Sequence, residues 1–276
     1  MTTQFDTRTS ARELNKQIEQ HLQELSEATD KARTSEEMIR YLDFCAKFHQ
    51  YSAGNIWLIL MAKPDASHVA GFRKWQTLGR WVRKGEHGIP ILAPILVREE
   101  HEDDVKEKRL VGFKVVHIFD LRQTEGDPLP PQPNWKSLEK SQELNQNLIE
   151  YARMHCISVT FKDLSNDIQG VSRGGRIELD NLAGTKTLIH EIAHELLHQG
   201  YRGFQSKIIK ELEAESIAYI VSRHFGLTGL NCPNYIALKG ISKDQMVAHF
   251  DIIQSTAGDL IRALEGEEHQ ESEPPF

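Results

Sequence analysis

The spacing of hydrophobic residues predicts a helical N-terminal region. From residue 10 to about residue 33 the chain is polar, except for hydrophobic residues at the period of a helix that buries one face: Leu14, Ile18, Leu22 and Leu25. Ser35, followed by two glutamates, indicates the start of a second helix. Residues 54–63 are hydrophobic on nearly every side, which predicts a buried helix that ends before Pro64.

Two strands and a proline-rich segment follow. Residues 89–99 and 109–121 are rich in β-branched residues and predict two strands, joined by a highly charged hairpin connection. The stretch TEGDPLPPQPN, residues 124–134, holds four prolines and no hydrophobic period, so we interpret it as a linker between domains.

The pattern beyond the linker is mostly helical. A helix is expected from residue 135 to about 155, then two strands over 156–161 and 174–180. Further helices are expected, over 183–199, 206–226, 233–240 and 242–266, before an acidic tail. The sequence thus predicts an α+β protein with an N-terminal domain of helices and a small antiparallel sheet, 1–123, and a helical domain with a small sheet, 135–266, followed by a disordered tail, 267–276.

Composition narrows the class of protein. No window approaches the run of about 18 hydrophobic residues that a membrane span needs, and the polar N-terminus does not resemble a signal peptide. The three cysteines are far apart, which favours a reducing cytoplasm. The net charge of −7 comes from the part after residue 125, because the first 125 residues hold equal numbers of acidic and basic side chains.

The stretch TLIHEIAHELLHQG, residues 187–200, contains a possible zinc site. On a helix, His190 and His194 lie on one face and can hold one metal ion, while Glu191 lies about 100° round the axis, beside the metal. That position suits a general base that takes a proton from metal-bound water. The alternative is a charged surface helix that matches HExxH by chance.

A catalytic zinc needs a third protein ligand, and the following helix supplies candidates. His198 has turned about 80° away from His190, so we interpret it as structural or as supporting a ligand. Glu211 and Glu215 share one face of a helix with many hydrophobic residues, where carboxylates need partners. We expect Glu211 to be the third ligand and Glu215 to accept the N–H of a ligand histidine, with Glu213 as the fallback ligand. Candidates for oxyanion stabilisation stay open between Tyr201, His224 and Tyr235.

A basic and aromatic stretch lies in the N-terminal half. GFRKWQTLGRWVRKG, residues 71–85, has five cations, no acid and three aromatic rings. Cations that contact phosphates, interleaved with rings that stack on bases, are typical of proteins that bind single-stranded nucleic acid. The alternative is that Trp75 and Trp81 are core residues with a solvated rim of cations.

The region around this stretch resembles the N-terminal domain of the ArdC-type antirestriction proteins of conjugative plasmids. Its family pattern is matched, in residues 51–95, by Ser52, Asn55, Pro64, Gly71, Trp75, Gly79 and Lys84-Gly85. The resemblance implies binding of single-stranded DNA, followed by a zincin-like metallopeptidase domain. The residues that it nominates for DNA binding, with the cations and rings of the stretch, are Asn55, Arg73, Lys74, Trp75, Arg80, Trp81, Arg83 and Lys84.

The C-terminal half resembles the ImmA/IrrE type of gluzincin peptidase. HEIAHELLH matches that family's HExxH helix, and residues 211–215 match its third-ligand helix, although Glu215 replaces the usual Asn or Asp. The resemblance implies Zn2+ held by His190, His194 and Glu211, with Glu191 as the catalytic residue.

The resulting prediction is a cytoplasmic zinc metallopeptidase of the antirestriction type that binds single-stranded DNA and hydrolyses a protein substrate at or near it, without a membrane partner. One alternative is a non-catalytic DNA-binding antirestriction protein whose zinc site is structural. Another is a regulator whose N-terminal domain contacts protein rather than DNA.

Overall fold

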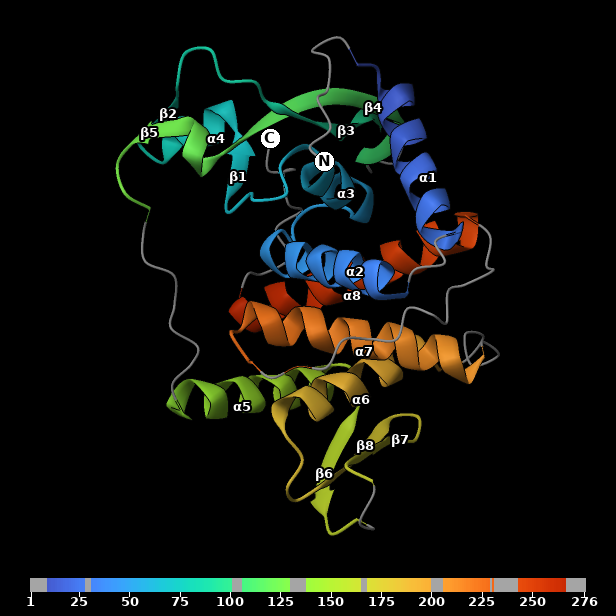
Figure 1. Ribbon diagram of the computed structural model, residues 1–276. Helices are drawn as coiled ribbons and strands as arrows, with labels where there is room; N and C mark the ends of the chain where they lie inside the picture. Colours follow the sequence, from blue (N-terminus) through green and yellow to red (C-terminus); the bar gives the residue numbers. More distant parts are fainter. Residues whose placement is uncertain are drawn as a thin grey trace. The chain divides into compact units, whose positions relative to one another are not determined.

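The computed structural model contains helices and three small sheets, in agreement with the α+β prediction (Figure 1). It describes residues 9–27, 31–100, 106–129, 138–164, 168–199, 206–228, 230 and 243–266. The chain divides into two compact units: unit 1 comprises residues 1–23, 54–130 and 271–276, and unit 2 comprises 24–53 and 131–270. Residues 24–53, which the sequence analysis groups with the first domain, therefore cluster with the second half of the chain.

The N-terminal helices match the hydrophobic pattern but not its boundaries. Helix α1 (Ala11–Glu27) begins with a capping box, in which Ser10 and Glu13 each accept a backbone N–H of the other. The four hydrophobic residues that predict its inner face are all buried. The helix ends earlier than predicted, and α2 (Lys31–Lys47) begins before Ser35. Helix α3 (Ala53–Ala62) is buried on most sides, as its composition predicts.

Unit 1 is built on a long antiparallel ribbon. Strand β3 (Ile89–Glu100) pairs with β4 (Lys106–Asp120), and β1 (Val69–Gly71) pairs with the other side of β4. Helix α4 (Phe72–Thr77) follows β1, and two short strands, β2 (Arg80–Val82) and β5 (Thr124–Gly126), pair with each other. Strand β5 falls within the segment predicted to be a linker, and residues 130–134 of that segment lie outside the described residues.

Strand β3 is an edge strand with an unusual outer side. It contains Pro90 and Pro94, which have no N–H to donate. Between them, the amide of Asn55 on α3 donates to the carbonyl of Leu92 at 2.9 Å and accepts its N–H at 2.8 Å. Asn55 thus satisfies the outward-facing backbone groups of Leu92 and ties α3 to the sheet.

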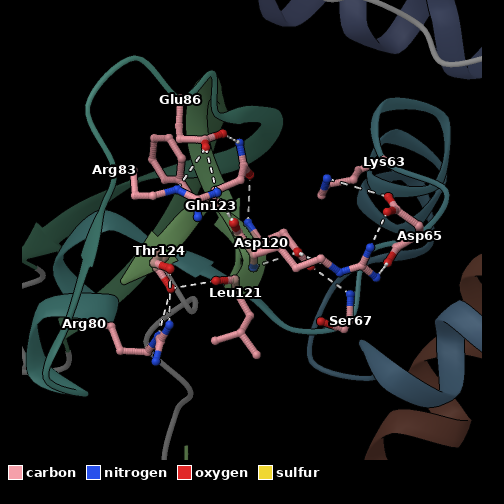
Figure 2. A network of polar contacts seen from close by, with 12 residues as sticks. Lys63, Asp65, Ser67, Arg80, Arg83, Glu86, Asp120, Leu121, Gln123 and Thr124 are labelled. Carbon is pink, nitrogen blue, oxygen red and sulfur yellow. Dashed lines mark hydrogen bonds and ion pairs between the residues drawn. The ribbon is translucent and has the colours of Figure 1, made fainter. Parts of the chain in front are cut away.

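A buried carboxylate organises the corner after β4 (Figure 2). Asp120 is fully buried and accepts the N–H groups of Ser67 (2.7 Å) and Arg122 (3.0 Å). It caps the short 3-10 helix η1 (Leu121–Gln123), whose Gln123 accepts the N–H of Asp120 at 2.9 Å and donates to Glu86 at 3.1 Å. This network fixes the chain reversal that carries β4 into β5.

Unit 2 places one helix between a sheet and a layer of helices (Figure 1). The sheet order is β6 (Ser158–Lys162), β8 (Arg176–Asp180), β7 (Gly170–Ser172), with β6 parallel and β7 antiparallel to β8. Helix α6 (Thr185–Leu197) packs on this sheet and on α7 (Lys207–His224), which also contacts α8 (Lys243–Glu265) and α2; α5 (Leu138–Met154) contacts α6 and α8. The sequence did not predict β7, and the predicted helix over 233–240 and the acidic tail lie outside the described residues.

Polar contacts hold α2 to the rest of unit 2. Asp43 accepts from Arg223 at 2.8 Å and from the hydroxyl of Tyr219 at 3.2 Å, both on α7. The side-chain amide of Gln254 on α8 donates to the backbone carbonyls of His49 (3.3 Å) and Tyr51 (3.2 Å), just after α2. Helix α2 is therefore an integral part of the helical layer in unit 2.

A second buried carboxylate joins α6 to the sheet. Glu195 is almost fully buried and accepts from the hydroxyl of Ser172 at 2.6 Å. It also accepts three backbone N–H groups of the turn between β7 and β8, those of Arg173 (2.9 Å), Gly174 (2.9 Å) and Gly175 (2.6 Å). The two glycines have positive φ, which lets the turn direct its N–H groups at one side chain. Glu195 thereby holds β7 against α6.

Replacing Glu195 with Ala leaves these buried donors without an acceptor, so we expect unit 2 to lose about 3 kcal/mol of stability or more. Urea denaturation measures the loss, and hydrogen exchange at residues 173–175 locates it. The control is Glu150→Ala, because Glu150 is exposed and pairs with Arg153 in its own helix, a contact worth less than about 1 kcal/mol. Equal effects of the two substitutions would contradict this role of Glu195.

Candidate metal centre

Helix α6 positions two histidines on one half-buried face. Its inner side is hydrophobic, with five residues buried against the sheet and α7: Leu188, Ile189, Ile192, Ala193 and Leu197. His190 and His194 project from the next face, one turn apart, with side chains 19% and 14% exposed. Both side chains are thus mostly buried, but each keeps a part of its surface that a small ligand can reach.

Glu211 on α7 completes a group of three possible metal ligands. The Nε2 atoms of His190 and His194 are 3.0 Å apart, and the carboxylate of Glu211 lies 3.5 Å from the first and 3.7 Å from the second. Three ligands of a tetrahedral zinc, each about 2.0–2.1 Å from the metal, stand about 3.3 Å from one another. The separations match that geometry closely, so the three predicted ligands fit a tetrahedral divalent ion.

The second ring nitrogen of His190 faces a carboxylate. Its Nδ1 lies 3.3 Å from Glu215, and Glu215 is also paired with Lys186 of α6. A carboxylate at that nitrogen favours the tautomer that presents Nε2 to a metal. The structure therefore places Glu215 beside the second ring nitrogen of a candidate ligand, and its role as acceptor of that N–H stays a prediction.

The carboxylates oppose the effect of burial on His190. Burial disfavours the charged ring, but Glu215, Glu191 and Glu211 outweigh it and raise the pKa of His190. At His194, burial and the neighbouring His190 and His198 lower the pKa to about 3. His194 is therefore neutral at physiological pH, as a metal ligand must be. Because the pKa of His190 is raised, a larger fraction of the molecules carries a proton on this ring, and that proton must leave before a metal binds.

Glu191 lies beside the candidate ligands against the edge strand of the sheet. Burial raises its pKa, as do the carboxylates of Glu211 and Glu195, against the opposing charge of His190. A side chain at Gly170 of β7 would come within 2.8 Å of the Cγ atom of Glu191. The glycine thus allows the strand to lie directly against the carboxylate, and a raised pKa suits a group that must both take and return a proton.

His194 has a different partner at its second nitrogen. Its Nδ1 lies 2.8 Å from Nδ1 of His198, whose Nε2 lies 2.9 Å from the carboxylate of Glu213. The other oxygen of Glu213 lies 2.6 Å from Nδ1 of His249 on α8. Glu213, the fallback ligand of the sequence analysis, is thus engaged with two imidazoles instead. No sequence pattern indicates the roles of His249 and Glu195, because their contacts join residues that are far apart along the chain.

The residues nominated for DNA binding fall into two groups. Asn55 is buried on Leu92, and Trp75 is 1% exposed with its indole N–H donating to the carbonyl of Phe119 at 2.9 Å. These two side chains belong to the core of unit 1 and are not accessible to a DNA base. The guanidinium of Arg80 contacts Thr124 and backbone carbonyls, and that of Arg83 contacts Glu86 (Figure 2).

The other four nominated side chains are exposed, as is Arg83, whose side chain is 49% exposed. Arg73 and Lys74 lie on α4, Trp81 is 53% exposed on β2, and Lys84 follows it. Phe72, also on α4, is 48% exposed. These residues present cations and aromatic rings to solvent. The alternative interpretation, that the two tryptophans are core residues, holds for Trp75 but not for Trp81.

Of the three candidates for oxyanion stabilisation, one lies in the part of the chain that the structure describes. His224 contacts the carbonyl of Ala46 at 2.8 Å and Glu265 at 2.8 Å, on the side of α7 that faces α2 and α8. It is therefore committed to structural contacts. Tyr201 and Tyr235 lie outside the described residues.

In the part of the chain that the structure describes, no helix combines the length and hydrophobicity needed to cross a bilayer.

Comparisons with known proteins find a sequence relative and crystal structures with partial similarity to this chain. The chain is 27% identical, over 252 residues, to the uncharacterized protein pXO2-81 of Bacillus anthracis; the match covers 74% of this chain and 43% of the relative, so the chain spans less than half of that protein's length. Crystal structures of the antirestriction protein ArdC from the R388 plasmid, metal-free and Mn(II)-bound, match with TM-scores of 0.46 and 0.43, at 16% and 14% identity, over 79% and 80% of this chain and 85% of each crystallised chain.

The resemblance of the C-terminal half to ImmA/IrrE peptidases finds no support in these matches and stays a prediction. The N-terminal resemblance is confirmed: residues 8–126 match the family described as the N-terminal domain of anti-restriction factor ArdC.

Proposed function

We propose that this protein is a zinc-dependent metallopeptidase that binds single-stranded DNA through unit 1 and hydrolyses a protein at or near that DNA. The observation that carries the proposal is the triangle of His190, His194 and Glu211, with the carboxyl group of Glu191 on the next face of the same helix. Three ligands leave one position of a tetrahedral ion open, as catalytic zinc sites do.

Each residue of the site has a separate role in the proposed reaction. Bound zinc would polarise a substrate carbonyl and lower the pKa of a water molecule. Glu191 accepts the proton of the attacking water and returns it to the leaving amine, which suits a carboxyl group whose pKa is raised by burial. Glu215 orients His190, and Glu195 holds β7 beside Glu191.

A metal requirement is the first test. We expect one zinc per purified chain, and loss of nearly all of it in a His190→Ala, His194→Ala double variant, because two of three ligands are gone. Zinc affinity should fall as the pH is lowered, since His190, with its raised pKa, must lose its proton to bind. Elemental analysis and chelator competition measure both effects, with His155→Ala, at an exposed residue just after α5, as the control. Wild-type protein that takes up no zinc would overturn the proposal.

Glu191→Gln separates catalysis from metal binding. Losing the general base should lower hydrolysis of a labelled unstructured protein, such as casein, by about 100-fold or more, while zinc content and DNA affinity stay unchanged. Glu150→Gln, a change of the same chemistry at an exposed site on α5, is the control. If Glu191→Gln retains both hydrolysis and restriction protection in cells, the zinc site is structural and the non-catalytic alternative holds.

The DNA part of the proposal depends on the exposed side chains of α4 and β2. Removing the ring of Trp81 should weaken binding to an oligothymidine strand by about 1–3 kcal/mol, and Lys74→Ala should reduce the salt dependence by about one phosphate contact. Fluorescence anisotropy at several salt concentrations measures both. Phe161→Ala removes an exposed ring of unit 2 and is the control. Binding unaffected by either change, or insensitive to salt, would favour a protein partner instead.

A further inference from the structure

We propose that His198 and Glu213, supported by His249, form a hydrogen-bonded relay that fixes the tautomer and orientation of His194 as a metal ligand. This inference rests on the metal centre of the proposed function but not on hydrolysis. It assigns His198, Glu213 and His249 as positioning residues, since they act through His194.

The relay is continuous and buried. It runs from Nδ1 of His194 to Nδ1 of His198 (2.8 Å), and from Nε2 of His198 to Oε2 of Glu213 (2.9 Å). The side chains of His198 and Glu213 are 4% and 0% exposed. His249, 14% exposed, closes the chain at 2.6 Å from Oε1 of Glu213. Three helices, α6, α7 and α8, meet in it.

The direction of every hydrogen bond follows from ligation at one atom. When Nε2 of His194 holds a metal, the only N–H of that ring is at Nδ1, which must donate. Nδ1 of His198 then accepts, so its N–H lies at Nε2 and donates to Glu213. The carboxylate accepts from both His198 and His249, and each donor faces one acceptor. A neutral His198 is therefore the spacer that lets the charge of Glu213 act on a ligand it does not touch.

Burial gives a reason why Glu213 must take part. A fully buried carboxylate is costly unless it is hydrogen-bonded, and the imidazoles of His198 and His249 both lie at hydrogen-bonding distance from Glu213. The two ligand histidines are thus oriented in different ways: His190 lies beside a carboxylate directly, whereas His194 reaches one through another imidazole. The relay also gives α8 a role at the metal centre, through His249.

A matched pair of substitutions tests the relay. In His198→Phe the ring keeps its volume but cannot accept from His194, so zinc affinity should fall by about 10–100-fold. In His198→Gln the side-chain oxygen can accept and the amide can donate, so most of that loss should be recovered. Competition with a chromophoric chelator measures the affinity for zinc, and the visible spectrum of the cobalt-substituted protein reports a change of ligand orientation.

Glu213→Gln provides a second variant of nearly the same shape. Its amide can accept at one end only, so one of the two imidazoles loses its acceptor, and zinc affinity should again fall. Melting of the metal-free protein separates this effect from unfolding, and His155→Phe, at an exposed residue just after α5, should change nothing. A fall in zinc affinity with an unchanged cobalt spectrum and a destabilised metal-free protein would overturn the relay, as would wild-type affinity in both His198→Phe and Glu213→Gln. Absence of hydrolysis in a zinc-loaded wild type would refute the peptidase proposal and leave this test intact.

Discussion

The packing of α6 between α7 and the sheet is governed by the cost of burying charge. Glu213 on α7 is completely buried, and Glu191 and Glu195 on α6 are nearly so, among mostly hydrophobic residues. A carboxylate in such surroundings is tolerated only with hydrogen-bonding partners or a metal. The partners of Glu195 lie on the turn after β7, and those of Glu213 lie at the end of α6 and on α8. Satisfying these two carboxylates therefore fixes the register of those elements. The geometry of the candidate ligands is a consequence of that register.

The parts of the site that depend on local geometry could be predicted from the sequence. The pairing of His190 with His194 needs only the period of one helix, and one docking of two helices brings Glu211 to them. The contacts of Glu195 and His249 could not be predicted, because they join residues that the sequence separates widely and that carry no motif. Trp75 shows a different limit: a ring among cations has the same sequence pattern whether it is buried or exposed. The boundaries of the domains and the ssDNA contacts remain predictions.

The path of the chain matters for how this protein is divided in experiments. Residues 24–53 cluster with unit 2, yet they lie within the region, 8–126, that matches the ArdC N-terminal domain family. Within unit 2, Asp43 of α2 contacts α7, the helix that also carries Glu211. A fragment cut at the proline-rich segment would therefore deprive the candidate metal unit of a helix of its own core, and the region of the family match is not equivalent to one folding unit.

The outer side of β3 bears on a different property, the tendency of exposed sheet edges to recruit other chains. A free edge strand offers alternating N–H and C=O groups that a second molecule can extend into an intermolecular sheet, the first step of aggregation. Over residues 90–94 that possibility is removed: two positions have no N–H, and the groups of the residue between them are already held by Asn55. The side-chain amide takes the place of a neighbouring strand at one residue, which ends the sheet there and disfavours self-association along this edge.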